Sequence, residues 1–70
     1  MYEKMEQEIQ KAIDENLESI NEMVFEFVDS DGRSEEARRY LCDSLTLLAN
    51  ERHRLFSLKD LLDIEMEQKQ

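Results

Sequence analysis

The sequence predicts an all-α fold: an antiparallel two-helix hairpin that pairs with a second copy into a dimeric four-helix bundle. Apolar residues recur every three or four positions, which is the helical period. The chain has no Pro and a single Gly, enough punctuation for about one sharp turn. Its 70 residues form a single domain. Sandwiches, barrels and Rossmann-type domains need many turns and are excluded.

The first helix is expected over residues 2–28, where the steps between apolar residues alternate between three and four. The opposite face of this helix is acidic. Its carboxylates are Glu3, Glu8, Glu15, Glu18 and Glu22. A helix with one apolar and one charged face packs against a neighbour through the apolar face.

Residues 29–34 are predicted to form the turn. Gly32 is expected to supply a left-handed backbone conformation there. Ser34 is a good N-cap for the next helix, and Glu35 and Glu36 suit the positive end of its dipole. A connection this short makes the two helices antiparallel neighbours.

The second helix is expected over residues 35–67. Leucines recur at intervals of seven, which is typical of a bundle seam, at Leu41, Leu48, Leu55 and Leu62. Leu45 and Leu48 are predicted to form the centre of the core, opposite Ile20 and Val24.

The polar run at residues 50–54 leaves an alternative for the second half of this helix. The segment from Ser57 to Asp60 resembles a capping box, so a third helix could begin at about Ser57 and give a three-helix bundle. A second helix that is continuous, or kinked near 50–57, is favoured because neither Gly nor Pro follows Arg33.

A second apolar row remains on this helix once the leucine heptad is used. It consists of Tyr40, Leu47, Leu61 and Ile64, with Arg54 at its edge. Two rows make an apolar face wider than one partner helix can cover. These five residues are therefore the predicted partner-binding residues, and the partner is a second copy, another helical protein, or both.

The formal net charge of -9 disfavours nucleic acid as a partner, because phosphate binding needs a basic patch. Ten acids and two lysines fall in residues 1–31. All the arginines lie in residues 32–54: Arg33, Arg38, Arg39, Arg52 and Arg54. They are expected to neutralise the acidic first helix, within the hairpin or across a dimer; the alternative is a small basic patch for an acidic protein or RNA.

No arrangement for catalysis, a metal, a cofactor or a small-molecule substrate is predicted, so the chain is not expected to be an enzyme. His53 is the only histidine and is expected at the surface. Cys42 is the only cysteine, eleven residues before it, and is expected to be a small buried apolar residue. A lone cysteine favours a reducing compartment, and no apolar run is long enough for a membrane span, so a cytoplasmic location is expected.

Residues 42–54 carry a short resemblance to a known family. Cys42-Asp43-Ser44-Leu45, followed by Ala49-Asn50-Glu51 and Arg54, resembles the second helix of the Rop family of plasmid copy-number regulators. That resemblance implies a hairpin that dimerises into a four-helix bundle and binds RNA. RNA binding in that family uses basic and polar residues of the first helix, where this chain has Glu and Asp.

The predicted function is protein–protein interaction without catalysis, as a small acidic regulator, adaptor or co-chaperone. The first alternative is an inhibitor that mimics nucleic acid, since regularly spaced carboxylates on a rigid helix can imitate a phosphate backbone. The second alternative is a Rop-like RNA-binding hairpin.

Overall fold

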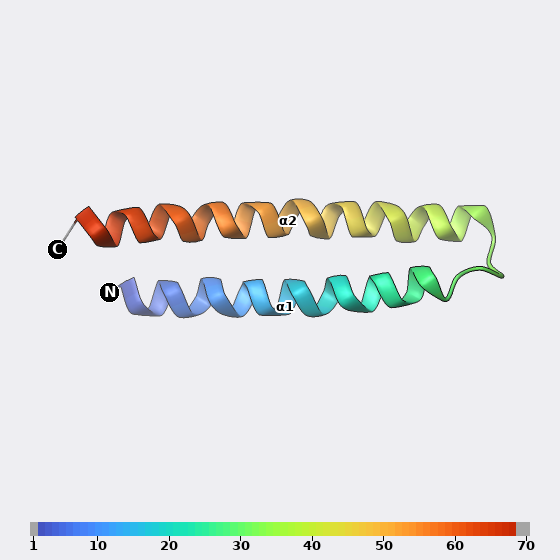
Figure 1. Ribbon diagram of the computed structural model, residues 1–70, viewed down its shortest axis with the longest axis horizontal. Coiled ribbons are helices and arrows are strands. Elements are labelled where there is room, and N and C mark those ends of the chain that lie inside the picture. The colour runs from blue at the N-terminus through green and yellow to red at the C-terminus, as the bar shows by residue number, and fades with distance from the viewer. Residues whose placement is uncertain (1, 69–70) are drawn as a thin grey trace.

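The computed structural model describes residues 2–68 and shows two long helices packed as a hairpin. Helix α1 spans Tyr2–Val28 and helix α2 spans Glu35–Gln68, with 27 and 34 residues. The molecule is a rod of 56 × 14 × 12 Å with both chain ends at the same end (Figure 1). The predicted all-helical hairpin and the absence of strands are therefore confirmed for residues 2–68.

Helix α2 is continuous, so the alternative with a third helix from about Ser57 is not realised. The Ser57 hydroxyl does not cap a new helix; it donates to the carbonyl of His53, one turn earlier, at 3.0 Å. Thr46 makes the same bond to the Cys42 carbonyl at 3.1 Å. Hydroxyls bonded to the preceding turn are compatible with a helix interior.

In the turn, the predicted N-cap at Ser34 is confirmed, whereas the predicted left-handed conformation of Gly32 is not. The amide of Ala37 donates to Ser34 Oγ at 3.2 Å, so Ser34 caps α2 as expected. Gly32 does not have a positive φ, so the left-handed conformation predicted for it is wrong. Ser30 holds the turn instead: it is buried, its hydroxyl donates to the Phe27 carbonyl, and its own carbonyl accepts from the Arg33 amide at 2.9 Å.

The core is a narrow seam between the two helices. Its fully buried apolar side chains are Ile13, Leu41 and Leu62. The heptad leucines all lie on this seam, since Leu48 and Leu55 are half-buried. Ile20, Met23 and Phe27 continue the α1 side of the seam and are also half-buried.

Two residues expected inside lie outside. Val24 is 44% exposed, because the packed stripe of α1 steps from Met23 to Phe27 and passes beside it. Cys42 is exposed as well. It follows the buried Leu41, and one residue turns the side chain about 100° around a helix.

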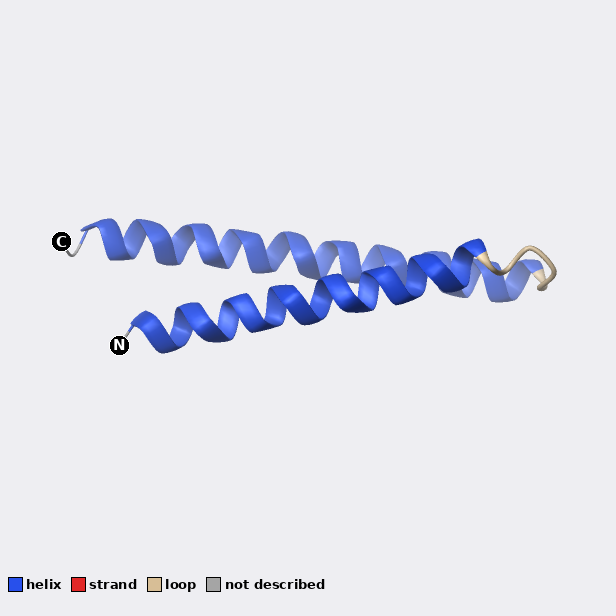
Figure 2. Ribbon diagram, turned by 60° about the horizontal axis from the view of Figure 1, so that its bottom comes forward, coloured by secondary structure: helices blue, strands red, loops and turns tan. Residues whose placement is uncertain are grey.

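The helices cross at a shallow angle, as the two ribbon views together show, and Figure 2 shows them apart at the free ends. Shallow crossing is typical of helices whose side chains interlock in the manner of a coiled coil. Within residues 2–68 neither helix is both long and apolar enough to cross a membrane.

Candidate protein-binding surface

More large apolar side chains lie on the surface of this hairpin than inside it. Among residues 2–68, eleven large apolar side chains are exposed, whereas three apolar side chains are buried. Phe25, Val28, Tyr40 and Leu47 are each at least about two-thirds exposed, at 75%, 69%, 69% and 70%. Soluble monomers rarely expose contiguous apolar patches, which mark surfaces for other molecules.

The predicted partner-binding residues all lie at the surface of α2. Tyr40, Leu47 and Leu61 are exposed and share one position of the seven-residue repeat, since they are separated by seven and fourteen residues. Arg54 is exposed between Leu47 and Leu61. Ile64 is 50% exposed, but it follows Leu61 by three residues and occupies a different position of the repeat, so it flanks this row. We call Tyr40, Leu47 and Leu61 the α2 row.

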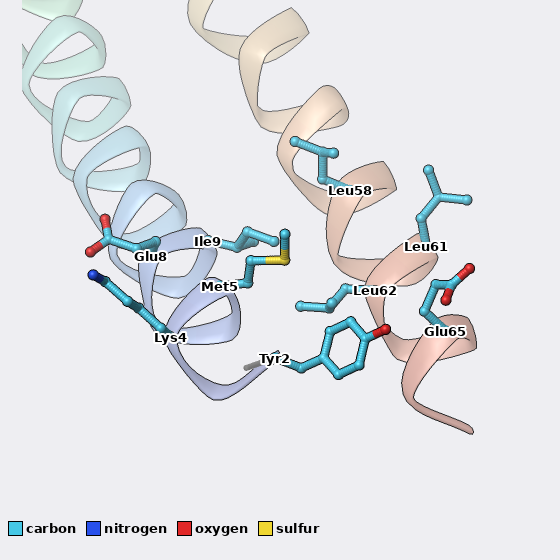
Figure 3. Close-up of a pocket in the computed structure, with 9 residues that line it drawn as sticks. All are labelled: Tyr2, Lys4, Met5, Glu8, Ile9, Leu58, Leu61, Leu62 and Glu65. Carbon is cyan, nitrogen blue, oxygen red and sulfur yellow. The ribbon is translucent and has the colours of Figure 1, made fainter. Parts of the chain in front are cut away.

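A groove opens between the helices at their free ends, and Leu61 links it to the α2 row. The groove has a volume of about 670 Å³. Its apolar lining comes from Tyr2, Met5 and Ile9 of α1 and from Leu58, Leu61 and Leu62 of α2. In Figure 3, Tyr2, Met5 and Ile9 reach from α1 towards α2, and Leu62 reaches back between them. We call this space the free-end groove.

The free-end groove has charged side chains at its rim: Lys4, Glu8 and Glu65. Lys4 and Glu8 point away from α2, so the space between the helices is lined almost entirely by carbon (Figure 3). Glu6 and Lys59 lie on the opposite side of the seam, beside a cavity of about 80 Å³. An apolar floor with a charged rim is the usual anatomy of a protein interface.

Two of the groove residues, Met5 and Leu58, were not among the predicted partner-binding residues. Met5 is 55% exposed and Leu58 is 51% exposed. Their apolar character placed both on the expected core stripes of their helices. Both side chains line the free-end groove, so the edges of both stripes remain uncovered at this end.

The middle of the seam is polar. Asn16 is 4% exposed, and its Nδ2 donates to the Leu48 carbonyl across the helices at 3.0 Å. Its Oδ1 is buried without a hydrogen-bond partner among the described residues, and so is one Nη of Arg52. Buried polar groups without partners destabilise a core, so Asn16 stabilises the seam less than an apolar side chain of similar size would.

The arginines do not neutralise the acidic first helix within the hairpin. Among residues 2–68 the ion pair that forms lies within α2, between Arg39 and Glu35 at 3.9 Å. The guanidinium of Arg38 lies over the Phe27 ring at 5.4 Å, and that of Arg52 lies over the Phe56 ring at 4.9 Å. These arginines therefore cover aromatic rings of the hairpin.

The residues that could act as nucleophiles, acid–base groups or metal ligands are spread over the surface. His53 is exposed, as predicted, and Cys42 is exposed eleven residues earlier on the same helix. At a rise of about 1.5 Å per residue, this separates the two by roughly 16 Å along the helix. In residues 2–68 no group of three or more His, Cys, Asp and Glu side chains is placed to hold a metal ion.

None of the family models, curated proteins or solved structures compared with this chain matches it.

Proposed function

We propose that this protein acts by binding other proteins, without catalysis, as a small acidic regulator, adaptor or co-chaperone. The observation that carries this proposal is the inverted distribution of apolar side chains, eleven exposed against three buried within residues 2–68. Apolar surface removed from water stabilises a complex by about 25 cal/mol per Å². A hairpin with this surface gains stability from any helical partner that covers it.

The α2 row is the surface that we assign to self-association. The row runs along α2 from Tyr40 to Leu61, and its Leu61 end lies among residues 55–70, which carry four acids and two lysines. Tyr40 and Leu47 lie among residues 32–54, which carry five arginines and four acids. A second copy meets little repulsion there, in contrast to residues 1–31, which have ten acids and two lysines. Two hairpins joined through this row form a dimeric four-helix bundle, in which partner binding competes with self-association.

The test is the double variant Leu47→Asp with Leu61→Asp. Both side chains are exposed, so the hairpin itself is expected to keep its helicity by circular dichroism. Light scattering should give about twice the 8.4 kDa chain mass for the unmodified protein and one chain mass for the variant. A monomeric mass together with a sharp cooperative melt in the unmodified protein would contradict the dimer.

The alternative function, mimicry of nucleic acid, would use the acidic face of α1 in place of the α2 row. Glu15, Glu18 and Glu22 are all exposed and form no ion pair among the described residues. If reversal of these three to Lys abolishes partner capture while Leu47→Asp with Leu61→Asp does not, the protein mimics nucleic acid. Capture of RNA at low salt that is lost at moderate salt would instead support the Rop-like alternative.

A further inference from the structure

We propose that the free-end groove binds an amphipathic helix of a partner protein, one with a short apolar stripe flanked by Lys or Arg. This inference rests on the proposed function and names the partner of one part of its surface. It is carried by the shape of the groove, by its lining and by the charge around it.

The shape of the groove favours a helix. It runs between two helices and is lined along α1 from Tyr2 to Ile9 and along α2 from Leu58 to Glu65. Each stretch extends over about two helical turns, or roughly 10 Å. A third helix lying along both would insert side chains spaced three and four residues apart, as in other complexes in which a helix binds in a groove.

The lining requires an apolar stripe on that helix. Met5, Leu58 and Leu61 are 55%, 51% and 61% exposed, and Leu62, only 7% exposed, forms the floor. These side chains offer a polar ligand no hydrogen bond beyond the weak acceptor sulfur of Met5. The groove is also open to solvent rather than enclosed, so a small molecule would remain largely hydrated, whereas a helix would cover both walls.

The charge around the groove favours Lys or Arg on both sides of the apolar stripe of the bound partner helix. Residues 2–11 and 58–68 hold seven carboxylates and three lysines, and at the rim Glu8 and Lys4 lie on the outer side of the α1 wall and Glu65 lies on the α2 wall. Lys or Arg at both edges of a bound helix would meet this excess of carboxylates favourably. A second copy that docked through its own free-end segments would bring the same negative excess, and an anionic lipid surface or a phosphate backbone would be repelled in the same way.

The binding test uses a labelled 21-residue helical peptide as the probe, with Leu at heptad positions a and d and Lys at e and g. Fluorescence anisotropy measures its affinity for the full chain. Four variants introduce the same change at exposed apolar positions: Met5→Asp and Leu58→Asp inside the groove, Leu47→Asp on the α2 row, and Phe25→Asp outside both. Because all four add one negative charge, they differ only in position.

Met5→Asp and Leu58→Asp are expected to weaken binding about 30-fold or more, the effect of losing an interface hot spot. Leu47→Asp and Phe25→Asp should stay within about 3-fold of the unmodified chain. If Leu58→Asp lowers helicity, Leu58→Ala takes its place in the comparison. Equal loss with Phe25→Asp would show that the effect is not confined to the groove, and it would overturn the proposal.

The preference for Lys or Arg beside the apolar stripe of the partner helix is tested by replacing the carboxylates at the groove rim. Glu8→Gln and Glu65→Gln should each weaken the Lys-edged probe about 1.5–5-fold at low salt, and Glu18→Gln, outside the groove, should not. A probe with Glu in place of Lys should bind more weakly than the Lys-edged probe. Equal binding of the two probes would overturn the assignment of basic edges.

Two further results would overturn the groove proposal and leave the proposed function standing. If Leu47→Asp abolishes probe binding and Met5→Asp does not, the partner lies on the α2 row alone. If the chain is dimeric and Met5→Asp makes it monomeric, the groove is covered by a second copy. A monomeric chain that binds no helical probe would instead overturn the proposed function itself.

Discussion

Replacing Asn16 with leucine is expected to stabilise the hairpin, although it removes a hydrogen bond between the helices. Asn16 is 4% exposed and its Oδ1 has no partner among the described residues. Removing an unsatisfied buried acceptor recovers about 1–3 kcal/mol, and the lost bond to Leu48 costs about 0.5–1.5 kcal/mol. Burying a leucine side chain contributes about 1.5–3 kcal/mol.

These contributions favour Asn16→Leu, and overpacking by the larger side chain opposes it by about 1–3 kcal/mol. We expect a net stabilisation of about 1–3 kcal/mol, which for a chain of this size raises the melting temperature by at least about 4 °C. The assay is urea and thermal unfolding followed by circular dichroism at 222 nm, at several protein concentrations because the hairpin associates in our proposal.

The control is Asn21→Leu, which makes the same chemical change at an exposed position of α1 and should alter stability by less than about 0.5 kcal/mol. A lower midpoint for Asn16→Leu than for the unmodified chain would refute the reasoning. It would mean that Oδ1 is satisfied in solution, by a water or by a group of a second chain.

Four further predictions concern the seam, the α2 row, the cap and the turn. Leu41→Ala should destabilise the hairpin by about 2–5 kcal/mol in urea unfolding, because Leu41 is 4% exposed. Leu47→Ala, with Leu47 at 70% exposed, should cost a monomer less than about 0.5 kcal/mol, and a larger loss that shrinks towards this value on dilution would reveal a second copy over the α2 row. Ser34→Ala should cost about 1 kcal/mol, and restoration by Ser34→Asp would show that capping is the cause. Gly32→Ala should be neutral or stabilise by about 0.4–1 kcal/mol, since Gly32 has no positive φ and an added Cβ would meet no atom within 4 Å; a clear drop in melting temperature would contradict the turn geometry.

The sequence by itself determined the two helices, the turn between them and its serine cap. The three-and-four spacing of apolar residues needs no tertiary information, and neither does the lack of a helix breaker after Arg33. The lack of a helix breaker after Arg33 also indicated that the helix continues through the polar run at residues 50–54, although the apolar stripe is interrupted there. Local geometry was sufficient for these features because each depends on residues within a few positions of one another.

Only the tertiary structure decided which edge of each apolar stripe is covered. A stripe wider than the contact leaves one edge in water, and the relative rotation of the helices selects that edge. Val24 and Cys42 lie on uncovered edges, whereas the polar Asn16 lies at the covered centre. The free-end groove depends on the crossing of the helices, which brings together Met5 and Leu58, 53 positions apart in the chain, and no local pattern contains that angle.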